Sequence, residues 1–330
     1  MALNVARFEH AGCTQWGVVH GDALLPVAGD FATTGDFVRA ADLAALRALE
    51  NSGGPTLPLA ECTLLAPVTR NQQFVCQGAN YRQHMIESGI DPDAKHYNML
   101  FTKAPGCIVA HDADIVRPAH VRLLDYEIEL GLVLRRDVTG PVDVTAANLH
   151  EFIAGLVMVN DVSARDVQVP QGQFYKGKSY RSFGPVGPWL CLLDAADMPR
   201  LAALELRLTV NGAVRQHDST ANMVFGPVAT LNELARLHDL AAGDLIATGT
   251  PAGCALAVPS PAKQRLAALL PEARKWALFA RAQAGRPYLQ PGDVVEASIH
   301  SSDGVIDLGT QRNRVVAAHP NADKTEIASR

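Results

Sequence analysis

Two glutamates separated by one residue, Glu127 and Glu129, lie in the segment LDYEIELG, whose other residues have the pattern of a buried strand. Side chains at positions i and i+2 of a strand point the same way, so these carboxylates face together, roughly 7 Å apart at their α-carbons. They repel each other unless water or a cation lies between them, and a hard divalent ion suits oxygen ligands. The alternative is a strand with one solvated face, and this segment alone does not decide between the two.

A third carboxylate, Asp161, ends the apolar run LVMVND and opens the polar run NDVSARD. At the end of a buried strand it would complete an oxygen site that leaves positions open for water or a chelating substrate. Taken alone, Asp161 is typical of a turn or a cap. Its interpretation as a metal ligand therefore depends on the two glutamates.

Polar groups suited to an anionic substrate follow Asp161. Arginine can hold a carboxylate through two parallel hydrogen bonds, and lysine offers a compact charge near a developing oxyanion. Each residue alone is typical of a surface, but their density among glycines ahead of FGPVGPW indicates a binding site. The set is Arg165, Gln168, Gln173, Tyr175, Lys176 and Lys178.

A candidate general base lies upstream, in ANYRQHMIESG. The pattern predicts a short helix capped by Asn80 and ending at Gly89. His84 and Glu87 are three residues apart and share a face of it, as a base oriented by a carboxylate would. The alternative is a plain surface helix, and His96 is a rival base.

Other catalytic signatures are missing from the sequence. It has no GxSxG elbow, no Walker loop and no GxGxxG after a strand. The six cysteines are scattered singly without a CxxC pair, which is typical of reduced thiols. Cys254, beside a glycine turn, is interpreted as a small core residue and not as a nucleophile.

Composition excludes several functional classes. The 330 residues are 48% hydrophobic and 19% charged, with a net charge of -5 and no long run of one sign. Nothing therefore favours binding to nucleic acid or to an anionic membrane. The N-terminus is too polar for a signal peptide, and no apolar run approaches the roughly 20 residues that span a bilayer. We expect a cytoplasmic protein.

The elements form two predicted domains, 1–69 and 70–330. Short strand-like runs and an amphipathic stretch at 36–49 make the first a small α+β domain rich in strands, and a Gly/Pro-rich connection at 51–59 favours the boundary. The second is mostly strands, with a helical insertion at about 257–290 and a flexible tail at 317–330. Its insertion offers a packing face of Leu266, Leu269, Leu270 and Trp276.

Three local patterns in the second domain predict specific elements. Alternation over 124–134 predicts a single strand with Leu124, Tyr126, Ile128, Leu130 and Leu132 on its core face. VTAANLHEFIAG predicts a helix begun by Thr145. LELRLTVNGAVRQHDS predicts a hairpin, because Asn211 and Gly212 tolerate the positive φ angles of a type I′ turn.

Six ordered motifs resemble the fumarylacetoacetate hydrolase family over about residues 70–316, and more loosely before them. They are GANYRQHMIE, DYEIELGLVL, NDVSARDVQ, GKSYRSFGPVGPWL, GDLIATGTPAG and PGDVVEASI. The resemblance implies an α+β, mainly β fold, a mixed β-roll or β-sandwich with a small N-terminal β-rich domain, usually dimeric. It departs from the family in the 257–290 insertion and in Arg181, where Asp is common.

The resemblance also implies roles for individual residues. Glu127, Glu129 and Asp161 would bind Mg²⁺ or Mn²⁺, with Ca²⁺ as a further candidate. His84 and Glu87 would activate water. Lys178 would lie beside the reacting carbonyl oxygen, while Arg165, Gln168 and Thr250 would bind the substrate. Tyr175, from the polar cluster after Asp161, completes the predicted substrate-binding set.

The implied activity is metal-dependent hydrolysis of a carbon–carbon bond in a 1,3-diketo acid of the acylpyruvate, fumarylpyruvate or fumarylacetoacetate type. Such chemistry serves the catabolism of aromatic compounds or sugar acids. The alternatives are a metal-dependent isomerase, hydratase or oxaloacetate-type decarboxylase acting on a keto acid or dienoate, and a non-catalytic ligand-binding relative.

Overall fold

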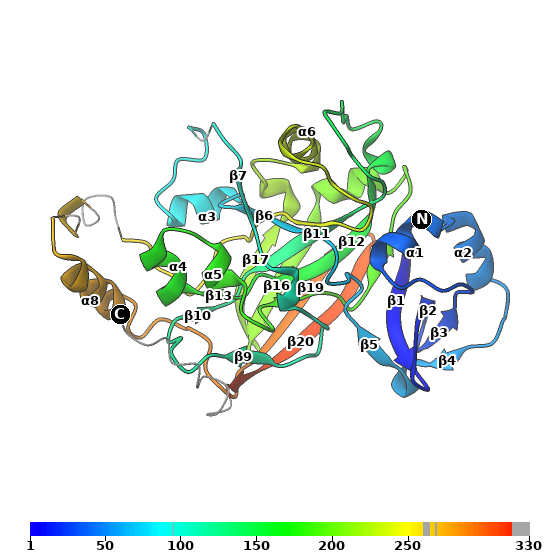
Figure 1. Cartoon of the computed structure of the whole chain (residues 1–330), viewed down its shortest axis with the longest axis horizontal. Helices are drawn as coiled ribbons and strands as arrows, with labels where there is room; N and C mark the ends of the chain where they lie inside the picture. The colour runs from blue at the N-terminus through cyan, green and yellow to red at the C-terminus, as the bar shows by residue number, and fades with distance from the viewer. Residues whose placement is uncertain (95, 260–264, 268, 319–330) are drawn as a thin grey trace.

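An eleven-stranded sheet runs through the protein (Figure 1), whose computed structural model describes residues 1–94, 96–259, 265–267 and 269–318. Its order is β4-β3-β2-β1-β15-β12-β11-β18-β6-β7, with β5 also paired to β1. The strands are β1 (Leu3–His10), β2 (Cys13–His20), β3 (Ala23–Pro26), β4 (Leu57–Pro58), β5 (Thr63–Leu65), β6 (Phe74–Gly78), β7 (Met99–Thr102), β11 (Ile128–Leu134), β12 (Ile153–Asn160), β15 (Leu190–Leu192) and β18 (Leu245–Ala247).

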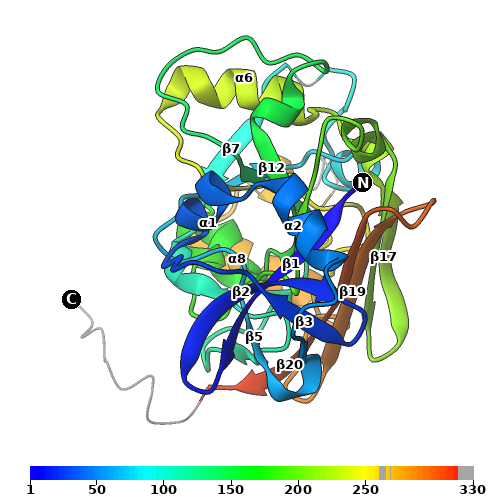
Figure 2. The same ribbon diagram turned by 90° about the vertical axis from the view of Figure 1, so that its right-hand side faces the viewer.

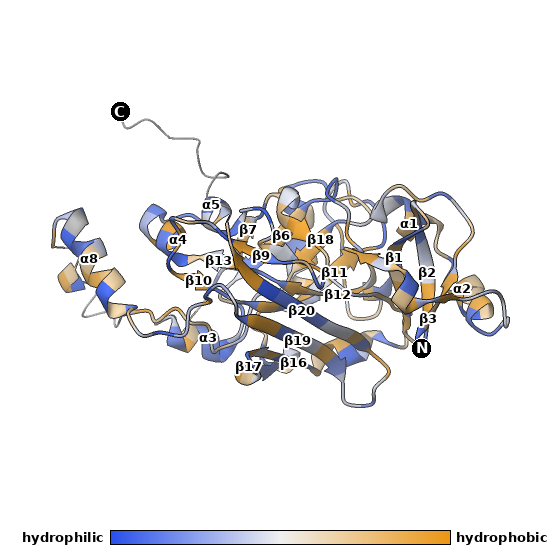
Figure 3. Ribbon diagram, turned by 90° about the horizontal axis from the view of Figure 1, so that it is seen from below, coloured by the Kyte–Doolittle hydropathy of each residue, from blue (hydrophilic) through white to orange (hydrophobic). Residues whose placement is uncertain are grey.

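A five-stranded sheet, in the order β17-β16-β19-β20-β9, packs against β11, β12 and β15. It consists of β9 (Ile115–Arg117), β16 (Leu204–Val210), β17 (Ala213–Ser219), β19 (Val294–Ser301) and β20 (Asp307–Ala317). Every second residue of β19 is buried, and buried and exposed residues also alternate over much of β20, which has a polar middle and an apolar end (Figure 3). Two short pairs complete the strands: β10 (Leu124–Asp125) with β13 (Ser163–Ala164), and β8 (Ile108–Val109) with β14 (Gly184–Pro185). The predicted mainly β fold is confirmed.

Helices are short and lie outside the sheets. The α-helices are α1 (Thr34–Ala40), α2 (Leu43–Glu50), α3 (Arg82–Glu87), α4 (Arg165–Gln171), α5 (Tyr175–Lys178), α6 (Pro227–Leu237) and α8 (Glu272–Ala282). Single 3-10 turns occupy Leu59–Glu61, Pro105–Cys107, Leu149–Glu151, Met198–Ala202 and Thr220–Asn222. No helix in the described ranges is long and apolar enough to cross a membrane. All six cysteines lie in those ranges and are free thiols.

The N-terminal strands continue the main sheet, because β1 pairs with β15 as well as with β2. Figure 2 shows β1, β2 and β3 side by side. The stretch 36–49 forms two helices. Thr33 and Asp36 make a reciprocal capping box at α1, and Asp42 caps α2. Phe37 of α1 stacks on Trp16 with ring centroids 4.1 Å apart, which fixes α1 on the sheet.

The segment 124–134 is not the single strand that its alternation predicts. It breaks into β10 and β11, because side-chain amides replace the ladder between them: Asn160 accepts from the Glu127 N–H and Gln216 from the Ile128 N–H, both at 3.0 Å. Both of its faces are buried, since it lies in the middle of a sheet that is covered on each side.

One predicted helix cap and one predicted helix were wrong. The short helix expected after Asn80 forms as α3, but its N-cap is Tyr81, and the Asn80 side chain instead donates to two backbone carbonyls of other segments. The stretch begun by Thr145 forms only a 3-10 turn, because Asn148 accepts from the Thr145 N–H at 2.7 Å and so competes with helical hydrogen bonds.

The predicted hairpin is confirmed. Asn211 and Gly212 have φ angles of 52° and 79°, and they join β16 to β17.

The insertion contains α8, which lies at one end of the molecule beyond α4 (Figure 1). The predicted packing face was partly wrong, since Leu266 and Leu269 are 68% and 81% exposed. Leu270 and Trp276 are half-buried. Residues 260–264 and 268 of the insertion and 319–330 of the predicted tail lie outside the described residues.

Candidate metal centre and active-site cavity

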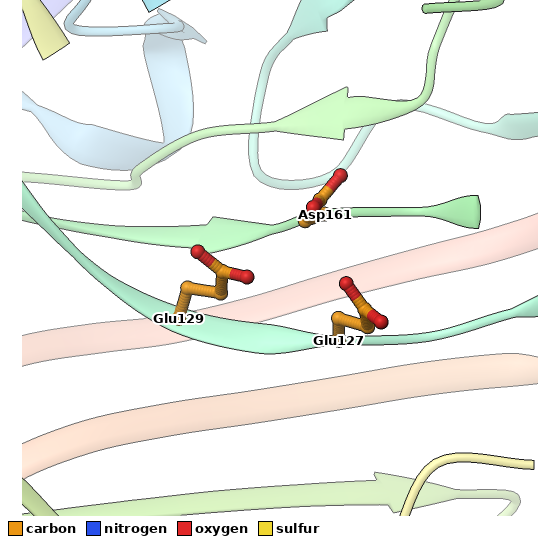
Figure 4. A group of neighbouring side chains, drawn as sticks. All are labelled: Glu127, Glu129 and Asp161. Carbon is orange, nitrogen blue, oxygen red and sulfur yellow. The ribbon is translucent and has the colours of Figure 1, made fainter. Parts of the chain in front are cut away.

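Three carboxylates converge where β11 and β12 meet (Figure 4). Glu127 and Glu129 flank Ile128, the first residue of β11, and Asp161 directly follows β12. One oxygen from each lies within 4.8 Å of the others. Glu127 is 5% exposed and Glu129 is 1% exposed, which excludes the solvated-face alternative.

Two buried lysines contact carboxylate oxygens of Glu127 and Asp161. Lys178 Nζ lies 2.5 Å from Glu127 Oε2, 2.5 Å from Asp161 Oδ2 and 2.9 Å from Ser163 Oγ. Lys103 Nζ lies 2.5 Å from Asp161 Oδ1 and donates to the Phe183 carbonyl at 2.7 Å. Asp161 is thus held by one ammonium group on each oxygen.

Arg165 pairs with acids of this site. Its Nε donates to Asp125 Oδ2 at 2.8 Å, a terminal nitrogen donates to Glu127 Oε1, and the other donates to Gln168 Oε1 at 2.9 Å. Asp125 also accepts from the backbone N–H groups of Ala255 and Leu256. Strand β10, two residues before Glu127, is therefore hydrogen-bonded directly to the chain that leads into the 257–290 insertion.

The site has more carboxyl groups than cations. Four buried carboxyl groups (Asp125, Glu127, Glu129 and Asp161) face three buried cations (Lys103, Arg165 and Lys178), so one negative charge is left over when all four are ionised. Burial and the charges of Asp161 and Glu127 raise the pKa of Glu129 well above its usual value. At Glu127 burial acts in the same direction, but Arg165 and Lys178 outweigh it and lower the pKa to about 2. An all-oxygen trio that needs one more cation before all its members can ionise fits a hard divalent ion.

A cavity of about 320 Å³ lies beside the trio. Its polar side includes Glu127, Glu129, Arg165, Gln168, Lys178, His84 and Thr250. Its apolar side includes Met99, Phe101, Val169, Phe174 and Leu256. The Phe101 ring centroid lies 5.2 Å from Lys178 Nζ, so the apolar wall begins at the lysine.

His84 lies on α3 and faces this cavity, whereas Glu87 lines a neighbouring one. Burial lowers the pKa of His84, which favours the neutral imidazole. Its Nδ1 is buried without a hydrogen-bond partner in the described part of the chain. Glu87 Oε2 accepts from the Gly253 N–H at 3.3 Å, and no hydrogen bond joins it to His84 within the described ranges. The structure places both residues on one helix without linking them.

The remaining predicted residues separate into two groups. Thr250 lines the cavity, with its oxygen accepting from Gln216 Nε2 at 2.8 Å. Gln168 also lines it. The rest of the polar cluster, Tyr175, Lys176 and Gln173, and the rival base His96 are exposed and do not line it.

Sequence reasoning missed four residues that shape the site: Lys103, Asp125, Asn160 and Phe101. A signal existed for two of them, because Asp125 lies inside the quoted acidic segment and Asn160 adjoins Asp161. Lys103 follows an apolar strand like many surface lysines, and Phe101 resembles any core residue. Only the fold reveals these two.

Comparison with known proteins agrees with this geometry. A family model described as fumarylacetoacetate (FAA) hydrolase C-terminal matches residues 73–316, most of the chain. The chain belongs to the fumarylacetoacetate hydrolase family. A further model, described as Rv2993c-like, N-terminal, matches residues 5–67 of this family member.

Relatives in the fumarylacetoacetate hydrolase family carry different activities in their names. The chain is 37% identical over 199 residues to oxaloacetate tautomerase YisK of Bacillus subtilis, covering 59% of this chain and 64%, less than two thirds, of that protein. It is similar to a fumarylacetoacetate hydrolase from Exiguobacterium antarcticum (TM-score 0.72, 30% identity, 96% and 100% of the two chains). It is also similar to a 2-hydroxyhepta-2,4-diene-1,7-dioate isomerase from Mycobacterium marinum (TM-score 0.68, 27% identity, 96% and 98%). Family membership alone therefore does not select the reaction.

Proposed function

We propose that this protein is a divalent-metal-dependent hydrolase that cleaves a carbon–carbon bond in a 1,3-diketo acid. The observation that carries the proposal is the buried trio Glu127, Glu129 and Asp161, which adjoins a cavity holding a cation, a neutral imidazole and an apolar wall. The trio would hold Mg²⁺ or Mn²⁺, with Ca²⁺ as a further candidate. The bound ion would polarise the 2-keto acid end of the substrate and stabilise negative charge there.

The protein's own groups would perform the remaining steps. Gln168 and Thr250 would bind the substrate carboxylate, while Arg165 holds Glu127 in place. Lys178, beside the apolar wall, would donate a hydrogen bond to the distal carbonyl oxygen and stabilise charge on it. The site would then bear one net positive charge with a dication, which suits an anionic keto acid.

Cleavage needs one water molecule and no oxidant. His84 would take a proton from water as the oxygen adds to the distal carbonyl carbon. The bond from that carbon to the methylene carbon then breaks, and its electron pair stays on the keto acid fragment as an enolate, which a proton converts to pyruvate or its analogue. The other product is a carboxylic acid. Glu87 would orient His84 after a small movement of α3.

A second candidate function is tautomerisation or isomerisation of a keto acid such as oxaloacetate. One observation favours it: His84 and Glu87 share no hydrogen bond in the described part of the chain, and enolate chemistry without hydrolysis needs no water-activating pair. The relative named as a tautomerase agrees with this candidate.

A substrate panel separates these functions. The panel consists of acylpyruvates, fumarylpyruvate, oxaloacetate and dienoates, each assayed with Mg²⁺, with Mn²⁺ or with a chelator. The reaction is monitored by the loss of diketo-enolate absorbance and by product analysis. We expect metal-dependent release of a carboxylic acid and pyruvate from acylpyruvates. Keto–enol exchange without cleavage would support the tautomerase instead, and cleavage that persists unchanged in chelator would contradict the metal site.

The protein is proposed to act as a cytoplasmic homodimer.

A further inference from the structure

An apolar groove of about 560 Å³ lies between α4 and the insertion. Its described lining includes Val258, Leu270, Trp276, Phe279 and Ala282, with Val169 contributed by α4. Lys275 is the one described cation in it, and that side chain is engaged by Glu272 at 3.5 Å and by the Trp276 ring at 4.7 Å. The groove therefore offers hydrocarbon contact to whatever occupies it.

The groove adjoins the active-site cavity. Val169 and Leu256 line both, and both residues are only partly buried. Val169 directly follows Gln168, which lines the active-site cavity, and the Leu256 N–H donates to Asp125 at 3.1 Å. These two side chains thus form the border between the smaller active-site cavity and the larger apolar groove.

The root of the insertion is firmly placed. Gln283 makes two hydrogen bonds to the backbone of Ala257, through its Nε2 at 2.8 Å and its Oε1 at 3.1 Å. Tyr288 donates to the same Gln283 oxygen at 2.8 Å, and the Leu289 N–H donates to the Leu124 carbonyl at 2.8 Å. The C-terminal end of α8 and the chain that follows it are therefore fixed to β10, the short strand that precedes Glu127.

The acyl end of the active-site cavity has no unengaged cation among its described lining residues. Arg165 is bound to Asp125 and Glu127, and Lys178 lies between Glu127 and Asp161. Beyond Lys178 the wall is aromatic, with Phe101 and Phe174 in edge-to-face contact at 5.0 Å. A second carboxylate, such as that of a fumaryl group, would be desolvated there without a partner.

We propose that the groove between α4 and α8 receives the apolar tail of the substrate, which is thus a 2,4-dioxo acid with an uncharged alkyl or aryl acyl group of medium length. The inference rests on the proposed function. A tail that passes Val169 and Leu256 would exchange water for contact with Leu270, Trp276 and Phe279. The insertion is then a specificity element of the active site.

Chain-length dependence tests this proposal. The kcat/KM of acetyl-, butanoyl-, hexanoyl- and fumarylpyruvate would be compared at fixed Mn²⁺. Full burial of a methylene corresponds to about a fourfold gain, so in a half-open groove we expect about twofold for each methylene and at least about tenfold from acetyl to hexanoyl. Fumarylpyruvate should be the poorest of the four. A flat or falling series overturns the proposal.

A pair of variants tests the groove itself. Phe279→Asp places a charge in the groove, whereas Ala277→Asp places the same charge on an exposed position of α8 outside the lining. We expect the hexanoyl-to-acetyl ratio of kcat/KM to fall at least about fivefold in Phe279→Asp. A hydrated carboxylate in the groove would remove most of the free energy gained by burying the methylene groups of the tail. The ratio should stay within about twofold of the parent in Ala277→Asp. Equal ratios in all three proteins overturn the proposal, and Tm values check that each variant folds.

Two further measurements identify the cause of a failure. Cleavage of acetylpyruvate without a chain-length gain contradicts only the groove. If no acylpyruvate is cleaved, the proposed function fails, and calorimetric binding of pyruvate and 2-oxononanoate with Mn²⁺ decides about the groove: tighter binding of the longer acid supports it, and equal binding overturns it. Light scattering tests whether a second copy of the chain occupies the groove instead. If Phe279→Asp loses self-association while its hexanoyl-to-acetyl ratio of kcat/KM stays unchanged, the groove is an interface and the proposal is overturned.

Discussion

At the scale of single residues, the site depends on charges that compensate one another within a few ångströms. Lys103, which no motif indicated, contributes one of three cations, and its side chain is fully buried against Asp161. Removal of Lys103 would leave one buried oxygen of Asp161 without its cation, although Lys178 would still hold the other. Lys103 should therefore matter to folding as well as to metal binding.

Replacement of that lysine gives the first prediction. Lys103→Met should lower the free energy of unfolding by about 3 to 5 kcal/mol in chelator, because Asp161 loses a buried partner. Urea denaturation measures it, with exposed Lys176→Met as the control, expected within about 0.5 kcal/mol of the parent. Equal midpoints for the two variants would contradict the buried pair.

Replacement of Glu129 should affect stability in the opposite direction from replacement of Lys103. Since burial and neighbouring acids raise its pKa, the neutral form is favoured without a cation, and ionisation as pH rises costs stability. Glu129→Gln should leave the Tm in chelator unchanged or higher while weakening Mn²⁺ affinity at least about 100-fold, a loss of about 2.7 kcal/mol of metal-induced stabilisation. Thermal shift and calorimetry measure both, and Glu205→Gln, whose side chain is half-exposed, is the control. Undiminished Mn²⁺ binding would remove Glu129 from the metal site.

His84 gives a prediction for pH. Burial lowers its pKa, so the base form persists to lower pH than for an ordinary histidine, and kcat/KM should fall only below that ordinary range. His84→Ala should lower kcat by about 10² to 10⁴-fold, abolish the acidic limb and keep the Mn²⁺-induced Tm shift. His96→Ala should keep the full rate. A normal profile in His84→Ala, or a loss in His96→Ala, would assign the base elsewhere.

At the scale of elements, side chains from distant segments terminate the strands where the metal ligands lie. Asn160 and Gln216 take the N–H groups that a continuous ladder would use, and Asp125 takes two more from the chain at 255 and 256. These hydrogen bonds stabilise the break between β10 and β11, where Glu127 lies. They also bring the hairpin β16–β17 and the insertion against the same strand.

The turn at Gly253 tests this contact between elements. Its φ is +103°, and a Cβ there would meet the Arg215 carbonyl of β17 at 2.0 Å, whereas Gly212 has φ +79° with nothing within 4 Å. Both glycine-to-alanine changes incur the left-handed backbone cost of about 1 to 2 kcal/mol. Gly253→Ala should lose a further 1 to 3 kcal/mol, roughly, because backbone must shift. Urea midpoints compare them, and equal losses would mean that the turn is free to move.

At the scale of the whole molecule, the N-terminal strands share one sheet with the catalytic part. Their core is shared too, since Leu3, Val5 and Trp16 belong to the same buried cluster as the central strands. Removal of β1 would expose the edge of β15. The two predicted domains are therefore joined by backbone hydrogen bonds and by common hydrophobic packing.

Truncation tests that connection. A chain of residues 70–330 should aggregate or stay unfolded, because it loses the β1–β15 pairing and the apolar cover of the sheet. Size exclusion and circular dichroism against the full chain measure this. A monodisperse fragment with a cooperative melt would show that the catalytic part folds independently.

Local sequence determined what short-range physics can specify. The alternation of 124–134 placed Glu127 and Glu129 on one side of extended chain, and Asn211 with Gly212 determined the hairpin, because backbone geometry sets both from neighbouring residues. Ordered motifs also identified the family. The predicted cap at Asn80 and the predicted helix at Thr145 were wrong because each outcome depended on which backbone group a side-chain amide bonded.

Only the tertiary structure decided which charges meet. Burial of both faces of the sheet excluded solvated glutamates, and residues separated by 58 and 17 positions, Lys103 and Lys178, both reached Asp161. Tyr175 and Lys176 belong to the same dense segment as Lys178, yet the fold turns them to solvent. The net charge of the site and the groove beside it are sums over segments far apart in the chain, and no local pattern contains them.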